Sequence, residues 1–222
     1  MSPNKDNLIR GLYAITPDET DTAELLRKVR LVLSGGARVL QYRNKIAGTS
    51  LRLVQAWALR ELTGEFSVSL IINDDAVLAQ QVDAEGVHLG GEDVGVAAAR
   101  AVLGNDKLIG VSCYNRMTLA HEAVRQGADY VAFGSFFAST IKPDAVAASP
   151  DLLWQARREI PVPLVAIGGI TVNNGALLLE AGADALAVIA AVFSATDIQG
   201  AARQLANLKY PENLFDKKKD TT

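Results

Sequence analysis

The chain has 222 residues, of which 49% are hydrophobic and 21% are charged, and its formal net charge is −3. This is an ordinary globular composition, and the small negative charge gives no electrostatic reason to expect nucleic acid or a membrane surface as a partner. The single cysteine excludes an intrachain disulfide and a thiolate metal cluster, and the two histidines argue against a multi-histidine metal site.

Both ends of the chain are polar. Residues 1–7 lack the apolar core of a signal peptide, and no apolar run reaches the roughly 20 residues that a membrane span needs. We therefore expect a disordered tail at residues 1–7, a single domain at residues 8–208 and a polar tail at residues 209–222. We expect a cytoplasmic protein with small molecules as partners, without nucleic acid or membrane, and a homo-oligomer is left open.

Short apolar runs alternate with amphipathic segments along the whole domain. The expected strands are residues 11–16, 39–43, 70–73, 86–89, 108–112, 130–133, 164–167 and 185–188, and the expected helices are residues 22–33, 51–62, 76–82, 96–103, 119–125, 151–159, 174–180 and 198–208. The strands are apolar on both faces and rich in valine and isoleucine, which is typical of a buried parallel sheet.

A glycine-alanine pair ends a helix and opens a strand three times, at Gly36, Gly127 and Gly182. Glycine accepts the left-handed conformation that stops a helix, so these pairs indicate the same joint used repeatedly. Eight successive strand-then-helix units predict an α/β fold, the (β/α)₈ TIM barrel. An open doubly wound sheet is the alternative.

The residues that follow the second expected strand point to an anion site. Positions two apart in an extended chain share a face, so Gln41, Arg43 and Lys45 would point the same way. The planar fork of arginine and the compact charge of lysine both suit a phosphate or pyrophosphate. The alternative is an exposed edge strand with solvated charges.

Active sites of this barrel class lie at the carboxyl ends of the strands. Polar residues or glycines follow most of the expected strands, namely Asn73, Asp74, Glu92, Asp93, Ser112, Ser139, Thr140, Lys142, Gly168 and Gly169, and Ile189 and Ala190 follow the eighth. The loop at residues 134–148 is longer than usual, and we expect it to be a lid that orders over a diphosphate through Lys142.

Two carboxylates, Asp74 and Asp93, would follow neighbouring strands close to these cations. Such an arrangement predicts Mg²⁺, which combines a few carboxylates with water and substrate phosphates. Asp93 has an alternative role as a helix N-cap, and we assign Asp75 to that role.

The scarce histidines and the cysteine do not form a catalytic constellation. His88 lies inside a strand and is expected to be a satisfied interior residue, whereas His121 is expected on a helix surface. Cys113 is expected to pack as a small apolar group, because no histidine partner is evident. A site with cations and carboxylates but few bases favours chemistry driven by a stabilised leaving group, such as pyrophosphate.

Taken in order, these motifs resemble thiamine phosphate synthase from about residue 11 to residue 208. The resemblance rests on GLYAIT at residues 11–16, QYRNK at 41–45, IND at 72–74, GVHLG at 86–90, ED at 92–93, GVS at 110–112, Lys142 and AIGGI at 166–170. Each motif is weak alone, but together, in order and at strand ends, they are highly specific.

The resemblance implies an enzyme, a transferase that joins a pyrimidine methyl diphosphate to a thiazole phosphate and releases pyrophosphate by a dissociative reaction. It implies Mg²⁺ at Asp74 and Asp93, and Arg43, Lys45, Ser112 and Lys142 as the catalytic residues. The residues implied in substrate binding are Gln41, Tyr42, Arg43, Asn44, Lys45, Asn73, Ser112, Ser139, Thr140, Ile141, Lys142, Gly169, Ile189 and Ala190.

Two positions depart from the family pattern. Ile141 stands where the family usually has threonine, and Ala190 stands where it usually has serine, so two hydroxyls are missing. They support one alternative, a catalytically silent barrel that binds a phosphate ligand. A second alternative is a thiazole tautomerase, which relies on a histidine where this chain has Tyr114. A third, a sugar-phosphate isomerase or epimerase, would need an acid/base pair that the sequence does not offer.

Overall fold

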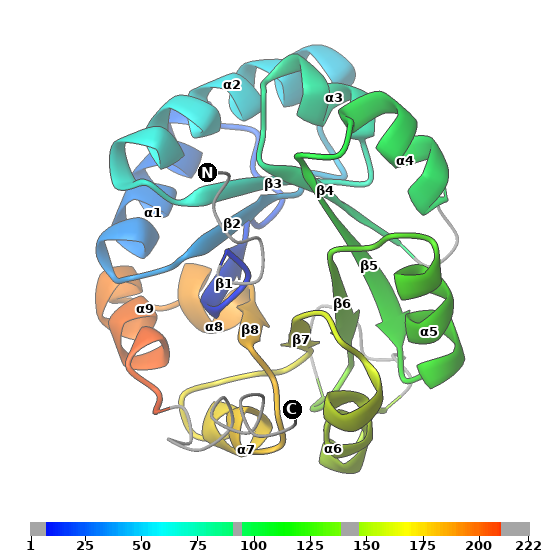
Figure 1. Cartoon of the computed structure of the whole chain (residues 1–222). Coiled ribbons are helices and arrows are strands. Elements are labelled where there is room, and N and C mark those ends of the chain that lie inside the picture. Colours follow the sequence, from blue (N-terminus) through cyan, green and yellow to red (C-terminus); the bar gives the residue numbers. More distant parts are fainter. Residues whose placement is uncertain (1–7, 91–94, 139–146, 210–222) are drawn as a thin grey trace.

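The computed structural model describes residues 8–90, 95–138 and 147–209, and within them eight parallel strands close into a barrel surrounded by helices (Figure 1). The strands are β1 (Gly11–Ile15), β2 (Val39–Tyr42), β3 (Ser69–Asn73), β4 (Gly86–Leu89), β5 (Leu108–Tyr114), β6 (Tyr130–Phe133), β7 (Leu164–Ile167) and β8 (Ala185–Val188). The described helices are α1 (Thr22–Ser34), α2 (Thr49–Phe66), α3 (Ala76–Gln81), α4 (Val96–Leu103), α5 (Met117–Arg125), α6 (Pro150–Glu159), α7 (Gly175–Glu180), α8 (Ala190–Phe193) and α9 (Ile198–Ala206).

The predicted (β/α)₈ barrel is confirmed, and the open sheet is wrong because β1 pairs with β8 as well as with β2. Several details of the prediction need correction, among them the bounds of α2, which runs from Thr49 to Phe66 instead of over residues 51–62. The short helix α8 was not expected, β2 ends at Tyr42 instead of at residue 43, and β5 continues to Tyr114. The expected tails at residues 1–7 and 209–222 lie outside the described residues, apart from residue 209. Among the described helices, none combines the length and the apolar character that crossing a membrane requires.

Local sequence signals explain where several elements begin and end. Gly36, Gly127 and Gly182 all have positive φ angles, as the recurring joints require. The Asp75 carboxylate accepts a hydrogen bond from the Leu78 amide at 2.9 Å, so its predicted role as the N-cap of α3 is confirmed. These signals stop and start each helix so that the next strand can join the sheet.

Two hydrophobic layers hold the barrel together. The larger one fills the space between the strands and the helices, and the smaller one fills the barrel interior. The interior layer includes Tyr13, Val39, Ile71, Leu108, Tyr130 and Val165. Both tyrosine hydroxyls lie among apolar groups, so each needs a hydrogen-bond partner there.

The Tyr130 ring fits inside the barrel because Gly110 lies opposite it on β5. A Cβ atom at position 110 would overlap the ring. We therefore expect Gly110→Ala to lower the free energy of unfolding by about 1–3 kcal/mol or more, the usual cost of overpacking a core. The measurement is urea unfolding followed by circular dichroism.

Gly64→Ala is the matched control for this prediction. A Cβ atom there would meet no atom closer than 4.0 Å, and the site lies within α2, where alanine is the better helix former. It should leave stability unchanged or raise it slightly. Equal effects of the two substitutions would contradict the packing argument.

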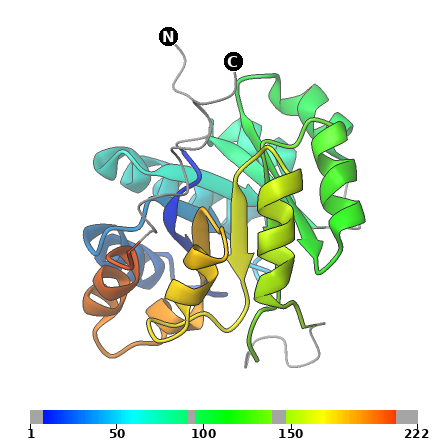
Figure 2. The same ribbon diagram turned by 60° about the horizontal axis from the view of Figure 1, so that its bottom comes forward.

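The outer surface carries the second histidine. Figures 1 and 2 both show α5 and α6 as neighbours on the outside of the barrel, and His121 of α5 meets Glu159 of α6 there at 3.0 Å. The His121 side chain is half exposed, so its predicted place on a helix surface is confirmed.

Candidate active site

Two cavities adjoin at the carboxyl ends of the strands. The first, of about 440 Å³, is lined by residues from all eight strands and from the loops that follow them, including Gln41, Asn73, His88, Ser112, Gly169 and Ile189. The second, of about 360 Å³, lies by the ends of β2 and β3 and is lined by residues that include Lys45, Arg52 and Asp74. Arg43 and Asn73 line both cavities, so the two spaces meet at these side chains.

The second cavity contains the cations predicted from the sequence, although not in the predicted geometry. Gln41, Arg43 and Lys45 were expected on one face of a strand, but β2 ends at Tyr42 and the backbone leaves the sheet there. Gln41 lies 3% exposed inside the barrel, Arg43 lines both cavities and Lys45 lines only the second. The prediction of one shared face is therefore wrong, whereas the cations are still brought together.

Asp18, in the loop between β1 and α1, organises these cations. Its Oδ1 accepts a hydrogen bond from the Lys45 amide at 2.7 Å and lies 3.3 Å from Arg43 Nη1. The Thr16 hydroxyl adds two more links, because it accepts from the Arg43 amide at 2.9 Å and donates to the Arg43 carbonyl at 2.8 Å. The backbone that carries Arg43 and Lys45 is thus held by the preceding βα loop.

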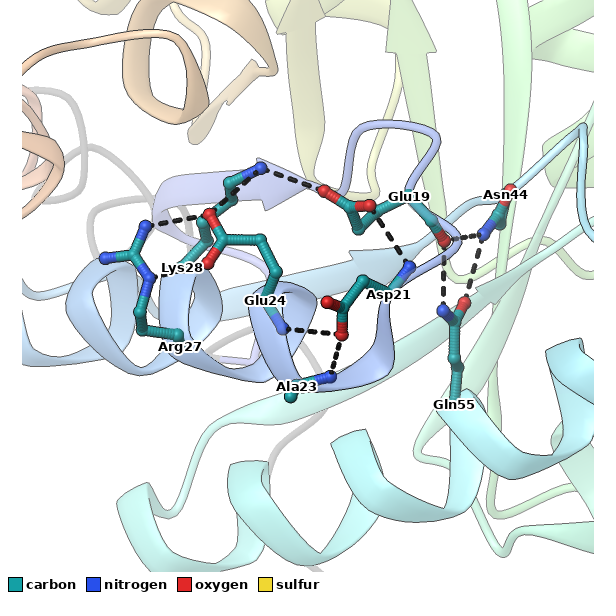
Figure 3. Close-up of polar contacts among 8 residues, drawn as sticks. All are labelled: Glu19, Asp21, Ala23, Glu24, Arg27, Lys28, Asn44 and Gln55. Carbon is teal, nitrogen blue, oxygen red and sulfur yellow. Dashed lines mark hydrogen bonds and ion pairs between the residues drawn. The ribbon is translucent and has the colours of Figure 1, made fainter.

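Tyr42 and Asn44 face a buried amide that the sequence did not identify (Figure 3 shows the Asn44 contacts). Gln55 of α2 is fully buried, and its Oε1 accepts from the Tyr42 hydroxyl at 2.7 Å and from Asn44 Nδ2 at 3.0 Å. Gln55 Nε2 and Asn44 Nδ2 both donate to the Glu19 carbonyl. Tyr42 and Asn44 therefore hold the loop in place, and their predicted contact with substrate stays a prediction.

Figure 3 also shows how the loop before α1 is fixed at its other end. Lys28 donates to the Glu19 carboxylate at 3.0 Å, and this hydrogen bond is the main reason that the pKa of Glu19 lies below its usual range. The Asp21 side chain accepts from the amides of Ala23 and Glu24 as the N-cap of α1. The loop is therefore anchored both to α1 and to α2.

Arg52 is a cation of the second cavity that sequence reasoning missed. It lies in the first turns of α2, lines the cavity beside Arg43 and Lys45, and is 3.8 Å from Asp75. Its Nε atom is buried without a hydrogen-bond partner among the described residues. An unsatisfied buried donor that lines a cationic cavity indicates a place for an anion. Only helix packing brings this residue to the strand ends, so no local motif could have indicated it.

Asp74 lies at the same cavity, directly after β3. It has a φ angle of 63°, a conformation that aspartate and asparagine adopt more readily than most residues, and its Oδ2 accepts from Asn73 Nδ2 at 2.6 Å. The described residues contain no cluster of three or more metal-ligating side chains. Asp93, the predicted second ligand, lies outside the described residues, as does its alternative role as a helix cap.

His88 and Ser112 line the first cavity together with Gln41 and Asn73. His88 Nε2 lies 2.9 Å from Ser112 Oγ, and Nδ1 lies 3.1 Å from the Tyr130 hydroxyl. Burial lowers the pKa of His88 to about 4, so its ring is neutral at pH 7. The prediction of a satisfied interior histidine is confirmed, although this histidine also lines the cavity.

Cys113 follows Ser112 but its side chain is fully buried, which confirms the prediction that it packs as an apolar group. Burial raises the pKa of its thiol to about 12. At pH 8 the thiolate fraction would then be about 10⁻⁴, compared with roughly a quarter for an ordinary thiol of pKa about 8.5. We therefore expect iodoacetamide to label the native chain far more slowly than the urea-unfolded chain, as measured by mass spectrometry. Equally fast labelling of the native chain would contradict this burial.

The two glycines after β7 allow another loop to pass close by. Gly168 and Gly169 have φ angles of 106° and 62°, and side chains there would collide with Ser135 and with the backbone of Phe137 and Ala138. The described ends of the predicted lid pack here, and the Ala148 amide donates to the Ser135 carbonyl at 2.8 Å. Gly168 and Gly169 line the first cavity, so their backbone lies within reach of a ligand.

The remaining predicted residues divide into two groups. Ile189 and Ala190 line the first cavity, on the β8 side and at the start of α8. Most of the predicted lid lies outside the described residues, and so do its site residues Ser139, Thr140, Ile141 and Lys142. The roles expected of these four residues stay predictions.

The comparison with known families agrees with this geometry. The family model described as thiamine monophosphate synthase matches residues 12–192. The chain belongs to the thiamine monophosphate synthase family. It is accordingly a member of a family of enzymes that act as transferases, as the sequence predicted.

Individual members of the family are similar over nearly the whole chain. A thiamine-phosphate synthase of Methylobacillus flagellatus is 55% identical over 90% of this chain and 95% of its own length. A thiamine-phosphate synthase of Nitrosomonas eutropha is 50% identical over 94% of this chain and 99% of its own. Among solved structures, the thiamine phosphate pyrophosphorylase of Pyrococcus furiosus has a TM-score of 0.80 and 34% identity, and the match covers 90% of this chain and 95% of that one.

Proposed function

We propose that this chain is a thiamine phosphate synthase. It joins 4-amino-2-methyl-5-pyrimidinylmethyl diphosphate to a thiazole phosphate and releases pyrophosphate. The observation that carries the proposal is the pair of adjoining cavities, one extending into the barrel and one lined by Arg43, Lys45 and Arg52. A ring in the first cavity and a diphosphate in the second would have the breaking bond near Arg43 and Asn73, where the cavities meet.

The reaction assigned to this site is dissociative. The bond between the pyrimidine methylene carbon and the diphosphate oxygen breaks first, and its electron pair leaves with pyrophosphate. The aminopyrimidine ring stabilises the cation that remains, and the thiazole nitrogen then donates its electron pair to the methylene carbon. Arg43, Lys45 and Arg52 hold the pyrophosphate as its charge increases, and Lys142 has the same predicted role.

The thiazole phosphate would occupy the opposite side of the first cavity. Gly169, Ile189 and Ala190 line that side, and the backbone N–H groups of Gly169 and Ala190 supply donors that do not depend on a side chain. The alanine at position 190 therefore removes one hydroxyl contact without removing the site. Ser139, Thr140 and Ile141 are proposed to contribute from the lid.

The donor set at the second cavity fits Mg²⁺, which binds through carboxylates and substrate phosphates. Asp74 lines this cavity beside Arg43 and Lys45, and Asp93 is proposed as the second carboxylate. The bound ion would supply positive charge to the departing pyrophosphate. The chain's own part is to place Asp74 there, through a left-handed backbone conformation and the hydrogen bond from Asn73.

The observations weigh against the alternatives. An isomerase needs an acid/base pair, whereas burial lowers the pKa of His88, which lines the first cavity, so that its ring is a weak base and supplies no acid at pH 7. The tautomerase alternative needs a histidine where Tyr114 lines the first cavity, and the similar proteins described above carry synthase or pyrophosphorylase names. The catalytically silent barrel is separated from the synthase by experiment.

The test is to mix both substrates with Mg²⁺ and to measure pyrophosphate and thiamine phosphate together. We expect equal amounts of the two products and neither product when the thiazole phosphate is omitted. Binding of both substrates without product formation would establish the silent binding protein instead. The cytoplasmic location stays a prediction.

A further inference from the structure

A continuous row of side-chain hydrogen bonds crosses the barrel interior from Asp74 to Ser112 and links the two cavities. Its links are Asn73 Nδ2 to Asp74 Oδ2 (2.6 Å), Gln41 Nε2 to Asn73 Oδ1 (2.6 Å), the Tyr13 hydroxyl to Gln41 Oε1 (2.8 Å), Tyr13 hydroxyl to Tyr130 hydroxyl (2.9 Å), Tyr130 hydroxyl to His88 Nδ1 (3.1 Å) and His88 Nε2 to Ser112 Oγ (2.9 Å). We call this row the interior chain.

The direction of the first links follows from their donors, which are the NH₂ groups of Asn73 and Gln41 and the hydroxyl of Tyr13. Asn73 must therefore present its NH₂ group to Asp74 and its oxygen to the next residue. That oxygen needs a donor, so Gln41 presents its own NH₂ group and leaves its oxygen for the Tyr13 hydroxyl. The protons of these three links all point toward Asp74.

The tyrosines and the histidine continue this direction. A phenol has one proton, and that of Tyr13 is directed to Gln41, so Tyr130 must donate to the Tyr13 oxygen. The Tyr130 oxygen then accepts from His88, which requires the proton of His88 to be on Nδ1. The His88 side chain is buried and its two nitrogens meet hydroxyl groups, so a charged ring would be costly there.

The last link, between His88 and Ser112, determines whether Ser112 can donate a hydrogen bond to a ligand in the first cavity or accept one from it. In an Nδ1–H imidazole the Nε2 atom is an acceptor, so Ser112 must donate its proton to it. The Ser112 oxygen lines the first cavity and retains lone pairs but no proton for a ligand. A phosphate oxygen, which only accepts, is therefore a poor partner for Ser112, whereas an N–H group is a good one.

We propose that the interior chain fixes His88 as the Nδ1–H tautomer and makes Ser112 a selective acceptor for an N–H donor, the amino group of an aminopyrimidine. The identity of this ligand rests on the proposed function, whereas the tautomer does not. Tyr13, Tyr130 and His88 are positioning residues in this scheme, because they act through Ser112. The interior chain also connects the Asp74 carboxylate, at the diphosphate end of the site, to Ser112, which is proposed to bind the pyrimidine ring.

The tautomer is tested on the full chain without ligand, by two-bond ¹H–¹⁵N NMR after labelling with ¹⁵N-histidine. The chain has two histidines, so a His121→Gln variant assigns the remaining signals to His88. We expect the pattern of a neutral ring protonated at Nδ1. A ring protonated at Nε2, or at both nitrogens at pH 7, would overturn the proposal.

Tyrosine variants test whether the interior chain determines the tautomer of His88. Tyr130→Phe keeps the ring but removes the acceptor for Nδ1–H, so His88 should shift toward the Nε2–H form. Tyr13→Phe should shift it in the same direction by a smaller amount, because it removes the proton acceptor of Tyr130. Tyr42→Phe is the matched control, because Tyr42 is also buried but its hydroxyl donates to Gln55, which is not part of the interior chain. Similar shifts in Tyr42→Phe and Tyr130→Phe would overturn the proposal.

Ligand selectivity is tested with 4-amino-2-methyl-5-hydroxymethylpyrimidine and with the same ring carrying hydrogen in place of the amino group. We expect the wild-type chain to bind the amino compound about tenfold more tightly, the usual effect of one hydrogen bond. Tyr130→Phe and Ser112→Ala should reduce this preference to less than about threefold, while their affinity for pyrophosphate with Mg²⁺ changes less. Equal binding of the two compounds by wild type would overturn the assignment of Ser112.

The two proposals fail separately. If the protein releases pyrophosphate but His88 is the Nε2–H tautomer, the proposed direction of the interior chain is rejected and the synthase reaction is retained. If the protein forms no product but His88 is the Nδ1–H tautomer, the proposed function is rejected and the hydrogen-bond direction of the interior chain is supported.

Discussion

Replacing Arg43 with lysine is expected to lower kcat by about a hundred- to a thousandfold, equivalent to about 2.7–4 kcal/mol of transition-state stabilisation. Arg43 lies where the two cavities meet, next to the bond that is proposed to break. Its guanidinium can hold two phosphate oxygens at once, whereas lysine offers one compact charge. Because pyrophosphate gains charge as it leaves, this contact should be stronger in the transition state than with bound substrate.

Steady-state kinetics with the pyrimidine diphosphate as the varied substrate provides the measurement. The KM for this substrate should change much less than kcat. The melting temperature should hardly change, because the hydrogen bonds with Thr16 that hold this loop are made by the backbone of residue 43, which lysine keeps. A kcat within about threefold of the wild-type value would show that Arg43 is only a solvated charge. That limit corresponds to a change of about 0.7 kcal/mol in the activation free energy.

Arg30→Lys is the matched control. Arg30 also donates two hydrogen bonds to one carboxylate, that of Glu65, at 2.7 and 3.2 Å. This pair lies on the outer surface, between α1 and α2, and both side chains are about half exposed. An exposed pair of this kind contributes little to stability. The control variant should keep wild-type kcat.

The second large effect is expected for Asp74→Asn, which should raise the Mg²⁺ concentration needed for half-maximal activity by at least about tenfold and lower activity at fixed Mg²⁺ by about a hundredfold. Asparagine tolerates the φ angle of 63° at this position and still accepts the hydrogen bond from Asn73. It removes the negative charge and replaces one carboxylate oxygen with an NH₂ group, so the loss reports on the ligand that the ion needs. Alanine would lose the charge and also strain the backbone.

Activity at increasing Mg²⁺ and binding of Mn²⁺ followed by electron paramagnetic resonance measure the two sides of this prediction. Asp75→Asn is the control, because Asp75 is the neighbouring residue but caps α3, a role that asparagine also performs. It should leave the Mg²⁺ requirement unchanged. Undiminished wild-type activity in excess chelator would rule out the metal role.

The sequence by itself determined the architecture of this protein. Eight short apolar strands alternating with helices, with glycines such as Gly36 and Gly182 at the joints, were sufficient to predict the closed barrel. The reason is that local periodicity and turn chemistry reflect interactions between near neighbours in the chain. The rule that barrel sites lie at the carboxyl ends of strands then placed Arg43, Asn73, Asp74 and Ser112 at one end.

Only the tertiary structure decided how these residues are held and which way they point. The end of β2 at Tyr42 separates Gln41, inside the barrel, from Lys45 at the second cavity. Arg52 arrives from helix α2, and Asp18 from the preceding loop. The interior chain depends on contacts between distant residues, such as Tyr13 and Tyr130, which are 117 positions apart. Barrel closure creates that contact, and because a buried hydroxyl must find a partner wherever the fold places it, no local pattern records which partner it finds.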